Sequence, residues 1–265
     1  MAKYKFGLAL SGGGIRGVAH IGVLMALRQI GLEPDIISGV SAGAIVGAMY
    51  ADGLSFDKML GVFRHSSFQK SVKFNMPKNG GLSNVKGYKN YLAKTLQTRK
   101  FSDLKIPLVV NATDLNEGTI TYFRDGNLLD AVVASASVPV LFNPYKIGSH
   151  YYVDGGILCN LPAEVLREEC ELVIGVHVNP ILPMPVSSKY GIKTVSERVF
   201  HLAVNGNTVR QKEFCDLVID MEREDEVGMF EASKSESLMK MGYDTAIDAF
   251  KNFDFSKFGL KVNIF

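Results

Sequence analysis

The chain has 265 residues, of which 47% are hydrophobic and 21% charged, and its formal net charge is +2. This composition is that of a globular protein, the length suits one large α/β domain over residues 1–265, and no tract has a composition that imposes disorder. Because no run of about 18 uncharged apolar residues occurs and the first apolar run is too short for a secretory signal, we expect a cytoplasmic protein without a membrane span.

The first fifty residues alternate between strand and helix patterns. The apolar run 6–10 predicts a buried strand that breaks into a glycine loop, and the periodic run 17–30 predicts a helix that ends at Gly31. A second strand is expected at 35–38, and the small apolar residues 42–51 predict a helix buried on most faces. Such alternation predicts a three-layer α/β/α fold with a mainly parallel central sheet.

The rest of the chain continues this pattern after an insertion. Further strands are expected at 107–111, 119–123, 151–153, 172–178 and 217–220, and further helices at 128–137, 194–214 and 230–252. Residues 56–104 have a mostly helical pattern that is interrupted at 76–81, so we interpret them as a helical insertion with a mobile loop that could act as a cap.

This insertion is strongly basic. Residues 58–105 hold eleven lysines and arginines against one acid, Asp103, whereas the rest of the chain has 18 basic and 26 acidic residues. Interleaved aromatic and aliphatic residues make peripheral contact with an anionic membrane one hypothesis, and a solvated face whose lysine stems cover the core is the other. Nothing in the sequence indicates a nucleic-acid partner.

The pattern Gly39-Val-Ser41-Ala-Gly43 lies between the second predicted strand and the second predicted helix. In this context G-x-S-x-G is typical of a nucleophile elbow, in which small residues allow a tight turn that exposes the serine hydroxyl. The helix that begins at Ala42 adds its dipole and a backbone N–H that favour an oxyanion. A small-residue turn without catalytic use remains the alternative.

The glycine loop after the first strand reads Gly12-Gly13-Gly14-Ile-Arg16-Gly17, which also satisfies the G-x-G-x-x-G dinucleotide fingerprint. Glu33 and Asp35 stand before the second strand and not at its end, so neither is placed to bind a ribose. The other interpretation is a row of backbone N–H groups that face a developing negative charge, with Arg16 as an added cation or an anchor.

A third signal is Asp154, which ends a predicted strand and precedes Gly155 and Gly156. Alone, such an aspartate is most often a turn cap. Taken together, however, the glycine loop, the run 17–24, the elbow, the segment Ala134-Ser-Ala-Ser-Val-Pro139 and Asp154-Gly-Gly resemble the patatin-like phospholipase family over about residues 5–180, with a looser match near 241–244.

The resemblance implies a Ser-Asp catalytic dyad of Ser41 and Asp154, an oxyanion hole at Gly12, Gly13 and Gly14, and hydrolysis of lipid acyl esters without metal or organic cofactor. A Ser-His-Asp triad is the competing mechanism, with His177 or His201 as the base. Two other functions stay open: a nucleotide-binding protein that uses the glycine loop, and a non-catalytic regulatory or adaptor protein on the same fold. For the three cysteines, which show no metal-binding spacing, we expect buried free thiols.

Overall fold

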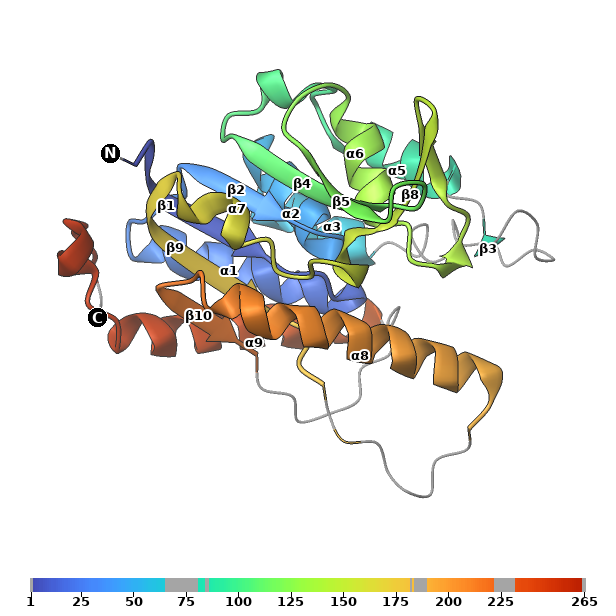
Figure 1. The fold of residues 1–265 in the computed structure, drawn as a ribbon. Helices are drawn as coiled ribbons and strands as arrows, with labels where there is room; N and C mark the ends of the chain where they lie inside the picture. The colour runs from blue at the N-terminus through green and yellow to red at the C-terminus, as the bar shows by residue number, and fades with distance from the viewer. Residues whose placement is uncertain are drawn as a thin grey trace.

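The computed structural model describes residues 2–64, 81–83, 86–181, 183, 190–221 and 232–263 (Figure 1). The first half contains β1 (Tyr4–Leu10), η1 (Gly14–Gly17), α1 (Val18–Gln29), β2 (Ile36–Gly39), α2 (Ala42–Ala51), α3 (Phe56–Arg64), β3 (Gly81–Ser83), α5 (Lys86–Thr95), η2 (Phe101–Asp103), β4 (Leu108–Asp114), β5 (Thr119–Phe123) and α6 (Leu128–Ser135). The second half contains β6 (Val140–Phe142), β7 (Tyr145–Ile147), β8 (His150–Asp154), η3 (Gly155–Ile157), α7 (Glu164–Arg167), β9 (Cys170–His177), α8 (Ile192–Lys212), β10 (Leu217–Asp220), η4 (Ala232–Lys234), α9 (Ser235–Lys251) and η5 (Phe255–Phe258).

The central sheet is mainly parallel, as the alternating pattern predicts. Its strand order is β10-β9-β1-β2-β4-β8-β7, and β5 pairs with β4 beside this path. The five strands from β10 to β4 are parallel, whereas β5, β7 and β8 form antiparallel pairs. Because β1 has β2 on one side and β9 on the other, the chain changes direction across the sheet at β1, where α/β folds commonly bind ligands.

The two faces of the sheet are buried by different numbers of helices. Leu8, Leu10 and Ile174 belong to a large cluster that also contains residues of α1, α2, α3, α6 and α9. The alternate positions Ala9 and Val173 belong to a smaller cluster completed by α7 and the segment before it. This alternation is the strand period of two, and it places helices on both faces of the sheet as the sequence predicts.

Helices α1 and α9 cross at two glycines. A side chain on Gly22 would lie 2.0 Å from the Met239 carbonyl oxygen, and one on Gly242 would lie 2.0 Å from that of Ala19. Only a residue without Cβ permits such a close approach of two helix backbones. The looser sequence match at 241–244 therefore includes a residue that fixes how the C-terminal helix packs on the fold.

The predicted insertion is helical at both ends of its range, where α3 and α5 lie. Residues 65–80, which include most of the interruption predicted at 76–81, lie outside the described residues. The sequence patterns do not predict β3, β6, β7 or α7, each only three or four residues long and too short for a periodic pattern. Among the described helices, none is both long and apolar enough to cross a bilayer.

Candidate active site

Ser41 lies in the turn between β2 and α2, where its backbone has a φ of 52° and a ψ of −118°. A positive φ is unfavourable for a residue with a side chain and persists only where the surroundings enforce it. Here the turn is tight, since a side chain on Gly43 would lie 2.3 Å from the Leu10 carbonyl oxygen. The two glycines of the predicted elbow therefore allow the backbone to pass directly over the end of β1.

The register of the sheet brings Asp154 beside Ser41. Gly39 of β2 pairs with Val110 of β4, and Ala112, two residues further along β4, pairs with Asp154. Ser41 also lies two residues beyond Gly39, so Ser41 and Asp154 lie at the same height along the strand direction. The Ser41 side chain interacts with the Asp154 carboxylate closely enough to lower its pKa.

Burial sets the pKa of the Asp154 carboxyl, because only 2% of this residue's surface is exposed. Desolvation raises its pKa to about 6, although hydrogen bonds from Ser41 and from the Gly156 N–H act in the opposite direction. The Gly156 N–H lies 2.8 Å from Asp154 Oδ1. Asp154 is thus ionised at neutral pH yet can accept a proton far more readily than an exposed aspartate.

The segment 134–139 holds both of these residues in place. The Ser41 N–H donates to Ser135 Oγ at 2.8 Å, and the Asp154 N–H donates to the Ser137 carbonyl oxygen at 2.9 Å. Ser135 and Ser137 are fully buried. The sequence match at this segment therefore has a structural basis, because each serine fixes one member of the Ser41–Asp154 pair.

The glycine loop faces Ser41 from the end of β1. A side chain on Gly12 would lie 3.2 Å from Ser41 Cβ and 2.6 Å from Asn160 Oδ1, so the loop can approach Ser41 only with glycine at this position. The Gly12 N–H donates to the Asn160 carbonyl oxygen at 3.2 Å. The N–H groups of Gly13, Gly14 and Ala42 have no acceptor within the described part of the chain.

Arg16 and Gly17 tie this loop to its surroundings. Arg16 is buried, and its Nη1 donates to Asn179 Oδ1 at 2.8 Å just beyond the end of β9. A side chain on Gly17 would lie 2.5 Å from the Ala42 Cβ, so the starts of α1 and α2 are in contact there. These contacts agree with the anchoring role considered for Arg16.

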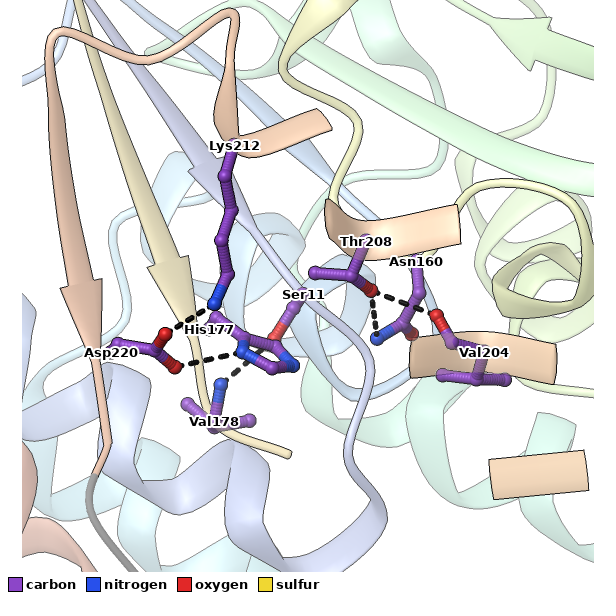
Figure 2. A network of polar contacts seen from close by, with 8 residues as sticks. All are labelled: Ser11, Asn160, His177, Val178, Val204, Thr208, Lys212 and Asp220. Atoms are coloured by element: carbon purple, nitrogen blue, oxygen red, sulfur yellow. Dashed lines mark hydrogen bonds and ion pairs between the residues drawn. The ribbon is translucent and has the colours of Figure 1, made fainter. Parts of the chain in front are cut away.

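Helix α8 supports the site from outside, which the sequence did not reveal. Asn207 Oδ1 accepts from the Asn160 N–H at 2.8 Å, and Asn207 Nδ2 donates to the carbonyl oxygens of Gly156 and Ile157. Figure 2 shows Thr208 of the same helix pointing at the side chain of Asn160, with 3.4 Å between Oγ1 and Nδ2. Asn160 therefore links the glycine loop, the turn after Asp154 and α8.

The histidines considered for a triad have other partners. His177 is 1% exposed, and its Nδ1 pairs at 2.8 Å with Asp220, which also pairs with Lys212 (Figure 2). Since β9 is separated from β2 by β1, the His177 backbone lies about 10 Å from that of β2. His201 contacts Asn179. His20, which is not a triad candidate, donates from Nε2 to the Ser11 carbonyl oxygen at 2.8 Å. This arrangement favours the two-residue mechanism over the triad.

The two acids considered for ribose binding lie at the end of the strands opposite to the glycine loop. Asp35 Oδ2 accepts from the Lys5 and Phe6 N–H groups at the start of β1, and Glu33 accepts from the Tyr50 hydroxyl. The glycine loop follows the other end of β1, so neither carboxylate can complete a dinucleotide site there. Of the cysteines, Cys159 and Cys170 are buried free thiols, and Cys215 is half-buried.

Comparison with known proteins identifies the family. A family model described as patatin-like phospholipase matches residues 8–167, which include Ser41, Asp154 and the glycine loop. The chain belongs to the patatin-like phospholipase family. The resemblance stated from the sequence motifs is confirmed.

Relatives in the family are much longer than this chain. Patatin-like phospholipase domain-containing protein 7 of Mus musculus is 33% identical over 64% of this chain and 13% of its own length. Lysophospholipase NTE1 of Debaryomyces hansenii is 30% identical over 68% of this chain and 12% of its own length. The chain therefore spans about an eighth of these patatin-like relatives.

The patatin fold also extends beyond the matched region. The crystal structure of VipD from Legionella pneumophila aligns with 94% of this chain and 67% of its own, with a TM-score of 0.52 and 16% identity. Patatin-like phospholipase domain-containing protein 6 of Mus musculus is 28% identical over 95% of this chain and 19% of its own length. The C-terminal third, with α8 and α9, is thus part of the shared architecture.

Proposed function

We propose that the chain is a serine hydrolase of lipid acyl esters, with Ser41 as the nucleophile and Asp154 as its base. The observation that carries the proposal is the register of the sheet, which brings a buried carboxylate with a pKa of about 6 beside the Ser41 side chain. A carboxylate whose pKa lies near neutral pH is an effective general base. The elbow places the Ser41 hydroxyl at the N-terminus of α2, where the helix dipole favours negative charge.

In the first half of the reaction, Ser41 Oγ attacks the ester carbonyl and its proton moves to Asp154. The carbonyl oxygen becomes an oxyanion, which the N–H groups of Gly13, Gly14 and Ala42 would stabilise. The Gly12 N–H is already used by the Asn160 carbonyl oxygen, so the role we give Gly12 is to permit the close approach of the loop. Collapse of the tetrahedral intermediate breaks the ester C–O bond, and Asp154 returns the proton to the leaving alcohol.

In the second half, a water molecule hydrolyses the acyl-serine. Asp154 takes a proton from the water as its oxygen attacks the acyl carbon, and the same amide groups stabilise the second oxyanion. Ser41 Oγ leaves with the proton held by Asp154, and a carboxylic acid is released. No step requires a metal ion, an organic cofactor or a histidine.

A lipid substrate is supported by the family and by the lysophospholipase among the relatives. We propose a phospholipid, a lysophospholipid or another long-chain acyl ester, cleaved in a phospholipase A or lysophospholipase type of reaction. The chain is one patatin-like domain in this proposal, with its helical insertion between α2 and β4.

The experiment measures hydrolysis of a p-nitrophenyl ester series and of phospholipid vesicles by wild type, Ser41→Ala, Asp154→Asn and His177→Ala. We expect the first two variants to lose activity and His177→Ala to retain it if it folds, since His177 contacts Asp220 and not Ser41. A wild type that hydrolyses neither class of substrate would refute the proposal and favour a regulatory role on the same fold.

Peripheral contact with an anionic membrane through residues 58–105 remains a separate proposal. Two of its described basic side chains form ion pairs within the fold: Arg64 pairs with Glu236, and Lys89 pairs with Asp130. Lys70, Lys73 and Lys78 lie outside the described residues. Replacing these three lysines by Gln should weaken binding to anionic vesicles and leave hydrolysis of a soluble ester intact, whereas unchanged vesicle binding would contradict the proposal.

A further inference from the structure

Helix α8 carries apolar side chains on the side that faces solvent. Val195, Val199, Leu202 and Val209 are 43%, 58%, 50% and 60% exposed. At 3.6 residues per turn these positions fall within about 80° of the helix circumference, and Gly206 lies among them. We call these five residues the α8 stripe.

The opposite side of α8 carries polar residues that bind the segment beside Asp154, together with Val204. Val204, Thr208 and Gln211 are buried on that side, about half a turn away from the stripe. The Gln211 side chain accepts from the Glu164 N–H at 3.0 Å, and Asn207 and Thr208 bind the segment 156–160 beside Asp154. In Figure 1, α8 is the long helix on the outside of the molecule. Most of its exposed aliphatic side chains therefore face away from the core, unlike those of an ordinary surface helix, whose apolar side faces the core.

Positive charge borders the stripe on both sides. On the helical wheel Arg198 and Arg210 lie about 60° to either side of its centre. The Arg210 side chain is 74% exposed, and its nearest carboxylate, on Glu164, is 3.9 Å away. Residues 192–212 contain four lysines and arginines and a single acid, Glu197. An apolar strip between cations is the pattern of a helix that lies in the interface of an anionic bilayer.

The area of the stripe favours a lipid surface over a second copy of the chain. From Val195 to Val209 the stripe is about 21 Å long, and a strip one helix wide covers roughly 200 Å². Stable protein interfaces bury about 800 Å² on each partner, so the stripe alone is too small for one. A bilayer needs no matching surface, because each apolar side chain that enters the acyl region adds its own share of binding.

We propose that the α8 stripe is the surface by which this protein docks on a phospholipid bilayer. Docking there would put lipid on the outer side of the helix whose inner side binds Asn160 and the turn after Asp154. The choice of a lipid partner rests on the proposed function, whereas the exposure of the stripe does not.

The test replaces Val199, Leu202 and Val209 together by Gln, and a matched control replaces Leu115, which is 50% exposed in the turn between β4 and β5, by Gln. Binding is measured by cosedimentation with vesicles of equimolar phosphatidylcholine and phosphatidylglycerol, in a Ser41→Ala background so that the vesicles are not consumed. We expect the triple variant to lose affinity roughly tenfold or more, since three half-exposed aliphatic groups no longer enter the bilayer, and the control to bind normally.

Two further measurements separate the possible outcomes. With Ser41 intact, the triple variant should hydrolyse a soluble short-chain ester at the wild-type rate but vesicle phospholipid more slowly. Unchanged vesicle binding, an equal loss in the Leu115→Gln control, or a wild-type dimer that the triple variant converts to a monomer would overturn the proposal. If wild type binds vesicles through the stripe but hydrolyses no ester, the docking inference stands and the proposed catalytic function fails.

Discussion

The buried Asp154 carboxylate should destabilise the folded protein at neutral pH. Its pKa is about 6 in the fold against an ordinary value of 3.8, so ionisation is harder in the folded chain than in the unfolded one. The difference of about two units corresponds to roughly 3 kcal/mol at a pH well above 6. Asn at position 154 removes the charge but keeps the shape and an oxygen that can accept the Gly156 N–H.

We therefore expect Asp154→Asn to be inactive and more stable than wild type, by up to about 3 kcal/mol at pH 8. Well below pH 3.8 the carboxyl is protonated in both states, so the gain should shrink as the pH falls from 6 to 4 and vanish below that range. Urea unfolding of both proteins at several pH values measures this directly. The pH dependence of the stability difference distinguishes the lost charge from other effects of the substitution, because lost or added hydrogen bonds would change the free energy of unfolding equally at every pH. A stability difference that stays constant from pH 4 to 8 would refute the reasoning.

Three other predictions test different parts of the structure. The kcat/KM for a soluble ester should rise with pH to a plateau above about 6, since Asp154 must be ionised to accept a proton; a flat profile from pH 5 to 8 would argue against it. Ser135→Ala should cost about 1–3 kcal/mol in urea unfolding, because the buried Ser41 N–H loses its acceptor. Gly242→Ala should cost about 2 kcal/mol or more through its clash with Ala19, whereas Gly61→Ala, with open space around it, should not destabilise.

The parts of the fold that the sequence predicts are those set by local patterns. The apolar runs of β1 and β9 and the small residues of α2 mark buried elements whatever lies next to them. The elbow around Ser41 and the loop at Gly12 are visible because their backbone geometry requires glycine within a few residues. The strand and helix alternation then fixes the parallel order of β1 and β2 through the handedness of their connection.

The contacts missed from the sequence are between residues far apart in the chain. Ser135 and Asn160 are ordinary polar residues until the fold places them against Ser41 and Gly12, 94 and 148 residues away. Asn207 is equally inconspicuous, since its partners lie 47 to 51 residues earlier. The sequence predicts a helix at 194–214 but not the α8 stripe, because periodicity does not tell which side of a helix faces solvent.

The central claim is that Ser41 is a nucleophile activated by Asp154, and covalent labelling tests it most directly. Wild type and Asp154→Asn would be treated with a fluorophosphonate at pH 8, and the modified residue would be identified by peptide mass spectrometry. The account predicts a single label on Ser41 in wild type and a much slower reaction in Asp154→Asn, in which the base is lost. A wild type that does not react, or a label on another residue, would contradict it.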